Sequence, residues 1–438
     1  MYGFALDFSD VFCSQTHDCF DKSLTYIEGL FKSPKGRATC LYMGDHQVGT
    51  DSQSIHHMLT TSPWSYQDLL DRILKRSVKL LSTHKKKIYL LIDEVGIRKK
   101  GKNSACVGRQ YLGCIGKHDN GQVAVVAALS SQDFYTPVDI ELFMPQDWQE
   151  DHKRRQKANI PEHIQHRTKP EMALAMILKL YKKIKEVEYV VFDALYGSST
   201  ELLAELIKNK IPFVGDVREN IIVYLSPPQM KIPINKGRGP KNKIPKPDKK
   251  GIYIRNYEKS LTQKEYQTID IRKGSKGSLV GLFHKRKVWV LCHKSKDFIA
   301  LNLLIRKNPD GSIQYALGYH PIKATLKGMV KAQAQRVFIE RVFEEGKNIV
   351  GMADCQVRSW QGFHRHMALC SLALLFLMEQ KLLLGKTIVG KVTAYQLQEL
   401  VNATIQTVNT LDEIIVCLMD KIPRYQSQIK KRFENSVT

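Results

Sequence analysis

Hydrophobic and polar positions follow a helical period over the first part of the chain. In residues 1–83, apolar residues recur every three or four positions, for example from Ser23 to Phe31 and from Tyr66 to Leu80. This spacing is typical of amphipathic helices, and no run in this segment alternates as a half-buried strand does. We therefore predict a helical N-terminal region over residues 1–83.

The pattern changes to that of strands over residues 84–219. Glycine and asparagine bound the first three strand-like runs, and we expect a turn at Asp119-Asn120-Gly121. A helix and a fourth strand follow, and Thr168 with Glu171 forms a capping box at the start of the helix. The predicted elements are strands at Ile88–Asp93, Gly108–Ile115 and Gln122–Leu129, a helix at Lys169–Lys185 and a strand at Val190–Asp193. This order predicts an α/β fold with an RNase H-like core, in which helices flank a mixed sheet.

Residues 220–328 predict a β-rich insertion. The insertion includes a stretch rich in Pro, Gly and Lys, Lys231–Lys250, which we interpret as a loop. Strand-like runs follow at Gly251–Tyr257, Gln267–Arg272, Lys287–Cys292, Phe298–Arg306 and Ser312–Leu317.

Helical periodicity returns after the insertion. We assign residues 329–385 to the second part of the core and residues 386–438 to a helical C-terminal region. Capping boxes at Thr393/Gln396 and Thr410/Glu413 predict two helices in the C-terminal region.

A strongly basic composition narrows the class of partner. The chain has 438 residues, with 67 Lys and Arg against 43 Asp and Glu and a formal net charge of +24. This excess is spread along the chain, which favours nucleic acid over a small acidic metabolite. The nine cysteines include no Cys-x-x-Cys pair, which argues against a disulfide framework or a zinc knuckle.

No segment predicts export or insertion in a membrane. Met1–Phe12 carries Asp7 and Asp10 and lacks a basic n-region. The longest apolar stretch, Met367–Met378, is too short to cross a bilayer, and we interpret it as a core helix. We expect a cytoplasmic protein without a membrane partner.

Two hydrophobic runs each end in an aspartate, Asp93 and Asp193. A single aspartate at a strand end commonly faces water or caps a turn. Two of them in one sheet are expected to meet at neighbouring strand ends, where their carboxylates repel one another unless cations lie between them. The pair therefore indicates a metal site.

A third carboxylate lies in a predicted helix, where Arg336, Glu340 and Lys347 fall at i, i+4 and i+11. The ordinary interpretation is a solvated face with an Arg336–Glu340 ion pair, worth only about 0.3–0.5 kcal/mol. Beside the two aspartates, Glu340 gains a second interpretation as the third ligand of two divalent ions. Arg336 and Lys347 would then meet phosphates.

The segments around these residues resemble the DDE transposases of bacterial insertion sequences. They are similar to the cut-and-paste group whose last catalytic helix carries the signature Tyr-x-x-Arg-x-x-x-Glu-x-x-x-x-x-x-Lys. Arg336, Glu340 and Lys347 match that register, whereas Gln333 stands in place of the tyrosine and Val95 where the family often has threonine. The similarity extends from about Tyr26 to Leu384 and includes Asp93-Glu94-Val95-Gly96, Lys99-Lys100-Gly101-Lys102, Gly108-Arg109-Gln110-Tyr111-Leu112-Gly113, Gly116-Lys117-His118-Asp119-Asn120-Gly121, Asp193-Ala194-Leu195-Tyr196-Gly197 and Val357-Arg358-Ser359-Trp360-Gln361-Gly362.

This resemblance implies a DNA-cutting and DNA-joining enzyme of a mobile element. Asp93, Asp193 and Glu340 would be catalytic and would bind two Mg²⁺ ions, with Mn²⁺ as a substitute. The DNA would be double-stranded, comprising the terminal inverted repeats of the element and the target, and a homodimer assembled on DNA would process both ends. The N-terminal helical region would help to recognise the repeats, and the β-rich insertion would contact the element's ends. A bacterial, nucleoid-associated location follows.

Residues beside these motifs are candidates for contacts with DNA. They are Arg336, Lys347, Lys99, Lys100, Lys102, Arg109, Lys117, Arg358 and Trp360. Trp360 has two interpretations, either stacking on a displaced base or packing in the core. No nucleotide cofactor is expected, because Asn103 replaces the Ser or Thr that a phosphate-binding loop requires after Lys102.

Two alternatives remain open. One is an RNase H-fold, structure-specific DNA nuclease that cuts without joining. The other is a catalytically inactive, DNA-binding descendant of a transposase. Retention of Asp93, Asp193 and Glu340 counts against the second, because a protein that only binds DNA has no need for three acids facing phosphate.

Overall fold

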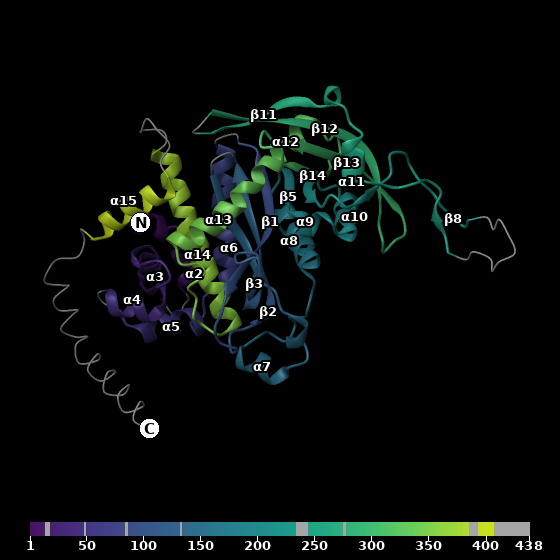
Figure 1. Ribbon diagram of the computed structural model, residues 1–438. Coiled ribbons are helices and arrows are strands. Elements are labelled where there is room, and N and C mark those ends of the chain that lie inside the picture. The colour runs from purple at the N-terminus through teal and green to yellow at the C-terminus, as the bar shows by residue number, and fades with distance from the viewer. Residues whose placement is uncertain are drawn as a thin grey trace.

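The computed structural model describes residues 1–13, 18–47, 50–83, 86–131, 134–233, 244–274, 277–384 and 393–406. Its N-terminal region is helical, as predicted, and contains α1 (Tyr2–Leu6), α2 (Ser9–Phe12), α3 (Phe20–Lys32), α4 (Cys40–His46), α5 (Ser52–Thr60) and α6 (Tyr66–Thr83). These helices gather on one side of a large central sheet (Figure 1).

The central sheet has ten strands among the described residues, in the order β11-β12-β13-β14-β6-β5-β1-β3-β2, with β4 paired to β3. The bounds are β1 (Ile88–Arg98), β2 (Gly108–Leu112), β3 (Lys117–Ser131), β4 (Phe134–Leu142), β5 (Val187–Phe192), β6 (Phe213–Val217), β11 (Gln267–Gly274), β12 (Gly277–Leu291), β13 (Phe298–Lys307) and β14 (Ile313–Tyr319). Strand β1 runs antiparallel to β3 and parallel to β5, which is parallel to β6. The fold is thus a mixed α/β architecture of the RNase H-like kind, as predicted.

Two details of the first strands differ from the prediction. Asp119-Asn120-Gly121 lies inside β3, and the chain instead turns at residues 113–116, where Gly116 has a φ of +64°. Strand β4 was not predicted because Pro137 interrupts its sequence and cannot donate a ladder hydrogen bond. The structure accommodates Pro137 opposite Ala128, at a shift in register on the outer side of β3.

The strands of residues 220–328 belong to the same sheet. Strand β14 pairs with β6, with Leu317 opposite Gly215, and β13, β12 and β11 extend the sheet outward. The predicted strand Gly251–Tyr257 is largely wrong, because only β10 (Ile252–Tyr253) is extended and α11 (Ile254–Lys259) follows. The smaller elements of this region are β7 (Ile222–Val223), β8 (Met230–Lys231), β9 (Lys246–Pro247) and the 3-10 helix η2 (Gln263–Glu265). Of the predicted loop, residues 234–243 lie outside the described part.

Helices cover both faces of the sheet (Figure 1). On one face lie α8 (Lys169–Lys183), α9 (Ala194–Gly197) and α10 (Thr200–Lys208), and the capping box at the start of α8 is present as predicted. The other face carries α12 (Leu326–Gln333), η3 (Ala334–Arg336), α13 (Val337–Ile349) and α14 (Trp360–Leu384). The remaining elements are η1 (Gln146–Trp148), α7 (His152–Lys157) and α15 (Ala394–Gln406). The Thr393/Gln396 cap is present, whereas Thr410 and Glu413 lie outside the described residues.

Helix α14 forms the core between the N-terminal helices and the sheet. By length and composition alone it could span a membrane, but 67% of its apolar window is buried inside the fold, where it contacts β4, α3, α5 and α6. Arg365 of α14 is 1% exposed and donates hydrogen bonds to the carbonyl oxygens of Leu59, Ser62 and Trp64. The apolar sequence of α14 is therefore that of a core helix, as predicted for Met367–Met378.

Candidate active site

Asp93 lies within β1 and not at its end. The strand continues to Arg98, with Asp93 opposite Val126 of β3, so the prediction of a strand-end aspartate is wrong for this residue. The hydrophobic run is interrupted by the half-buried Asp93 and Glu94, and burial resumes at Val95 and Ile97. The Oδ1 atom of Asp93 accepts a hydrogen bond from the Glu94 N–H at 2.8 Å.

Asp193 does follow the end of a strand. It is the N-cap of α9, and its Oδ1 atom accepts a hydrogen bond from the Leu195 N–H at 2.9 Å. In the parallel pairing of β1 with β5, Ile92 lies opposite Phe192. Asp93 and Asp193 therefore come next to each other, each directly after a paired residue.

Two glycines hold α9 close to β6. A Cβ atom on Gly197 would lie 2.0 Å from the carbonyl oxygen of Asp216, and one on Gly215 would lie 2.1 Å from the Phe192 ring. At Gly197 two backbones meet, and only glycine fits at so close an approach. This packing fixes the turn that carries Asp193 against the strand that carries Asp216.

The guanidinium of Arg336 pairs with two carboxylates, those of Asp216 and Glu340. Arg336 closes η3 at the start of α13, where its Nη2 atom lies 3.1 Å from Oε1 of Glu340 and its Nε atom 3.6 Å from Oδ2 of Asp216. The other carboxylate oxygen of Asp216 accepts a hydrogen bond from the Gln333 side chain at 2.8 Å. Sequence reasoning missed Asp216, although it also lies in a hydrophobic strand that follows a helix.

Burial and like charges raise the pKa values of the aspartates. The pKa of Asp93 is raised to about 7, first by burial and then by the nearby Asp193 and Glu94. Burial, with Glu94 next, also raises the pKa of Asp193, and burial raises that of Asp216. Such shifts arise where carboxylates are buried, and they are increased where negative charges lie close together.

The guanidinium of Arg336 is the counter-charge of this cluster. Burial acts to lower its pKa, but Asp216, Glu340, Asp93 and Asp193 together raise it. The predicted Arg336–Glu340 ion pair is therefore present, and it belongs to a larger group of charges.

Glu94, the residue after Asp93, has partners of its own. Lys169, at the start of α8, lies 3.1 Å from its Oε1 atom, and the Tyr196 hydroxyl donates to Oε2 at 3.1 Å. Glu94 nevertheless lies close enough to Asp93 and Asp193 to raise the pKa of both.

The cluster has the chemistry of a site for hard divalent cations. Carboxylate oxygens are the ligands that Mg²⁺ and Mn²⁺ prefer, and Asp93 with Asp193 presents two of them at adjoining positions. Among the described residues, however, no three His, Cys, Asp or Glu side chains are arranged to hold a metal ion. The Glu340 carboxylate pairs with Arg336 and does not join the two aspartates in this structure.

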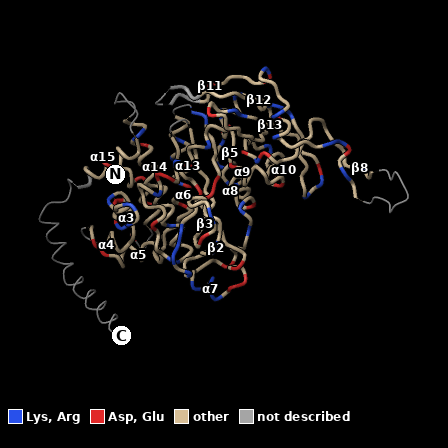
Figure 2. Tube along the Cα trace, viewed as in Figure 1, with Lys and Arg blue, Asp and Glu red and all other residues tan. Residues whose placement is uncertain are grey.

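The other candidate DNA contacts fall into three groups. Exposed side chains belong to Lys100, Lys102, Arg109, Lys117 and Arg358. Lys347 is half-buried, and Lys99 donates a hydrogen bond to the Cys355 carbonyl oxygen. Trp360 is 3% exposed and packs in the core, so it presents no free face for stacking on a base in this structure. Basic residues occur along the whole trace, including the regions of α7 and β8 (Figure 2).

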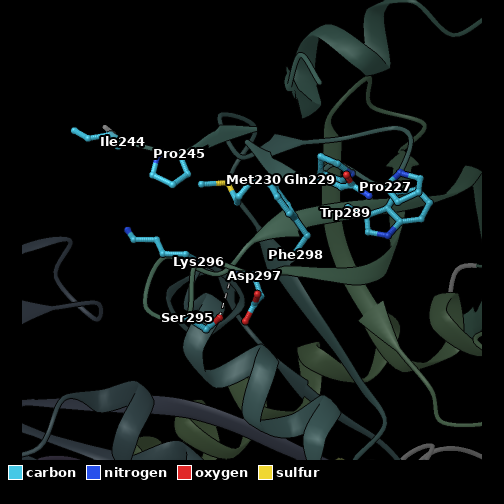
Figure 3. Close-up of a pocket in the computed structure, with 11 residues that line it drawn as sticks. Pro227, Gln229, Met230, Ile244, Pro245, Trp289, Ser295, Lys296, Asp297 and Phe298 are labelled. Atoms are coloured by element: carbon cyan, nitrogen blue, oxygen red, sulfur yellow. Dashed lines mark hydrogen bonds between the residues drawn. The ribbon is translucent and has the colours of Figure 1, made fainter. Parts of the chain in front are cut away.

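A separate pocket lies beside β8, β12 and β13. Its volume is about 580 Å³, and Pro227, Met230, Trp289 and Phe298 contribute its apolar lining, with Lys296 and Asp297 at one side (Figure 3). None of the carboxylates described above lines it.

Comparison with known proteins shows the family of the chain. The family model described as DDE superfamily endonuclease matches residues 10–278, which include Asp93 and Asp193 but end before Glu340. A protein of Microchaete diplosiphon, described as "Probable transposase for insertion sequence element IS701", is 35% identical over 184 residues, or 42% of this chain. That match spans 45% of the relative's length. The chain belongs to the DDE superfamily endonuclease family.

Proposed function

We propose that this protein is a transposase that cleaves DNA at the ends of an insertion sequence and joins the freed ends to target DNA. The observation that carries the proposal is the pairing of β1 with β5, which brings Asp93 and Asp193 together. Arg336 lies near both aspartates, since both contribute to its electrostatics, and its guanidinium pairs with Glu340. The similarity to a protein described as a probable transposase supports the same function.

Asp93, Asp193 and Glu340 are the proposed ligands of two Mg²⁺ ions, with Mn²⁺ as a substitute. Such ions, when bound, supply the charge that activates a water molecule and stabilises the leaving 3′ oxygen of a phosphodiester. Asp93 and Asp193 are held in place by their backbone hydrogen bonds, whereas Glu340 is 55% exposed and can rotate. Release of Glu340 leaves Arg336 with donors to spare for a phosphate oxygen.

Double-stranded DNA is the proposed substrate and partner. Arg109 and Lys117 are exposed on the β2–β3 hairpin, and Lys100 and Lys102 lie in the segment that precedes it. Such side chains attract phosphates whatever the base sequence. Because two ends of an element must be cut and joined together, we propose that the working form is a homodimer assembled on DNA.

The test is cleavage of a labelled duplex that carries the end of the protein's own element, in Mg²⁺ or in EDTA. Nicking should require the metal and should fall below detection in Asp193→Ala and Glu340→Ala. Glu344→Ala is the matched control, because Glu344 is exposed on the same helix and should retain wild-type activity.

Joining is tested separately by adding a supercoiled target plasmid. Strand-transfer products support a transposase, whereas metal-dependent nicking without joining identifies a structure-specific nuclease. Tight, salt-sensitive DNA binding with no nicking by the wild type would identify an inactive, DNA-binding descendant and overturn the proposal.

A further inference from the structure

Asp216 belongs to a chain of contacts that ends at Glu340. The Gln333 amide donates to one oxygen of Asp216 at 2.8 Å, and Arg336 lies between the other oxygen and Glu340, at 3.6 Å and 3.1 Å. One guanidinium is therefore shared by two carboxylates. The contact of its Nε atom with Asp216 is an ion pair without a hydrogen bond, since Nε has no hydrogen-bond partner.

The two carboxylates that share Arg336 differ in freedom of movement. Asp216 lies in β6, between β5 and β14, opposite Ala316, and its side chain is 19% exposed. Its backbone is further confined by the close approach of Gly197. Glu340 projects from a helix and is 55% exposed, so Asp216 is the fixed partner of Arg336 and Glu340 the movable one.

We propose that Asp216 is a positioning residue that retains Arg336 and thereby releases Glu340 for metal binding. This inference rests on the proposed function, in which Glu340 is a metal ligand. With Asp216 present, part of the guanidinium charge is already neutralised, and Glu340 can leave at a smaller electrostatic cost. Without it, Arg336 binds Glu340 alone and competes with the incoming cation.

A purely structural role predicts something different. If Asp216 serves only to pin α12 and η3 to the sheet, its loss lowers stability without changing the affinity for metal. The readout must therefore be metal binding itself, which we would follow through the electron paramagnetic resonance signal of free Mn²⁺ in a titration of the full chain.

Asp216→Asn is the primary variant, because asparagine keeps the shape and an acceptor for Gln333 but removes the charge. Mn²⁺ affinity should fall by roughly tenfold or more, the usual effect of losing a group that orients a metal ligand. Asp139→Asn is the matched control, since Asp139 is also a buried carboxylate of the sheet paired with a lysine, Lys179. The control should bind Mn²⁺ as the wild type does.

A double-mutant cycle shows whether the effect passes through Arg336. In an Arg336→Gln background, Asp216→Asn should cause no further loss of Mn²⁺ affinity. An equal loss in both backgrounds would mean that Asp216 acts directly on the metal, which overturns the inference. Asp216→Glu should restore part of the wild-type affinity, because it returns the negative charge.

Gln333→Met provides a second route if Asp216→Asn does not fold. It removes the amide that orients Asp216 while leaving the charge, and it should weaken Mn²⁺ binding in the same direction by a smaller factor. Wild-type affinity in whichever of these two variants folds contradicts the inference.

The outcomes separate this inference from the proposed function. A wild-type protein that binds Mn²⁺ and cleaves DNA, with a variant at Asp216 that does so equally well, leaves the proposed function standing and removes the role of Asp216. A wild-type protein that neither binds Mn²⁺ nor cleaves DNA overturns both.

Discussion

Asp93 is the residue at which charge and burial oppose each other most directly. Its pKa is raised to about 7, above the usual value of about 3.9 for an aspartate. The folded, metal-free protein therefore keeps a proton on Asp93 at a pH where the unfolded chain has lost it. A carboxylate in this position is useful for binding a cation but destabilises the fold when no cation is present.

The pH dependence of stability follows from this sign. Below about pH 4 both states are protonated, and Asp93 makes no pH-dependent contribution. As pH rises to about 7, the unfolded state loses its proton first, so the free energy of unfolding falls, by up to roughly 4 kcal/mol at about 1.4 kcal/mol per pKa unit. Asp93→Asn should remove this loss.

Urea denaturation in EDTA at pH 4.5 and pH 8 provides the measurement. The Asp93→Asn variant should be more stable than the wild type at pH 8, with a smaller difference at pH 4.5. Equal differences at the two values would show that Asp93 titrates normally.

At the scale of elements, the join between β5, α9 and β6 depends on close backbone contact. Gly197→Ala places a methyl group 2.0 Å from the Asp216 carbonyl oxygen, so α9 must move away from β6. The expected loss of stability is about 1–3 kcal/mol, measured by thermal unfolding. Gly113→Ala serves as the control, because a Cβ atom there meets nothing within 4 Å, and its melting temperature should match that of the wild type.

Helix α14 is tied to the N-terminal helices by one buried guanidinium. Arg365→Met keeps most of the volume but leaves the carbonyl oxygens of Leu59, Ser62 and Trp64 without their donor. Since each hydrogen bond to a charged group is worth about 1.5–3 kcal/mol, we expect a loss of at least about 3 kcal/mol in urea denaturation. A variant as stable as the wild type would mean that water replaces the guanidinium.

The elements also show why sequence pattern predicts some features and misses others. The Thr168 capping box and the strand before Asp193 are local signals, and both are confirmed. Strand β4 was missed because Pro137 argues against a strand unless its position at a register shift is known. The contact between Asp216 and Gln333 was missed because it spans 117 positions of the sequence, so no local spacing reveals it.

At the scale of the whole molecule, the net charge of +24 predicts how binding responds to salt. DNA affinity should fall linearly on logarithmic axes as salt increases, with a slope of about −0.9 for each phosphate neutralised. Arg109→Gln with Lys117→Gln should make that slope shallower by roughly 2, measured by fluorescence anisotropy. Lys182→Gln, an exposed residue on α8, is the control, and an unchanged slope in the double variant would place the DNA elsewhere.

The continuity of the sheet has a mechanical consequence. Hydrogen-bonded ladders link β12 through β13, β14 and β6 to β5. Strands β12–β14 and the strands that carry Asp93 and Asp216 are therefore parts of one continuous sheet and are not joined through a flexible linker. A DNA duplex bound to strands β11–β14 would therefore lie at a fixed distance from Asp93 and Asp193. The sheet would then set the distance along the DNA between the bound segment and the phosphodiester that is cleaved.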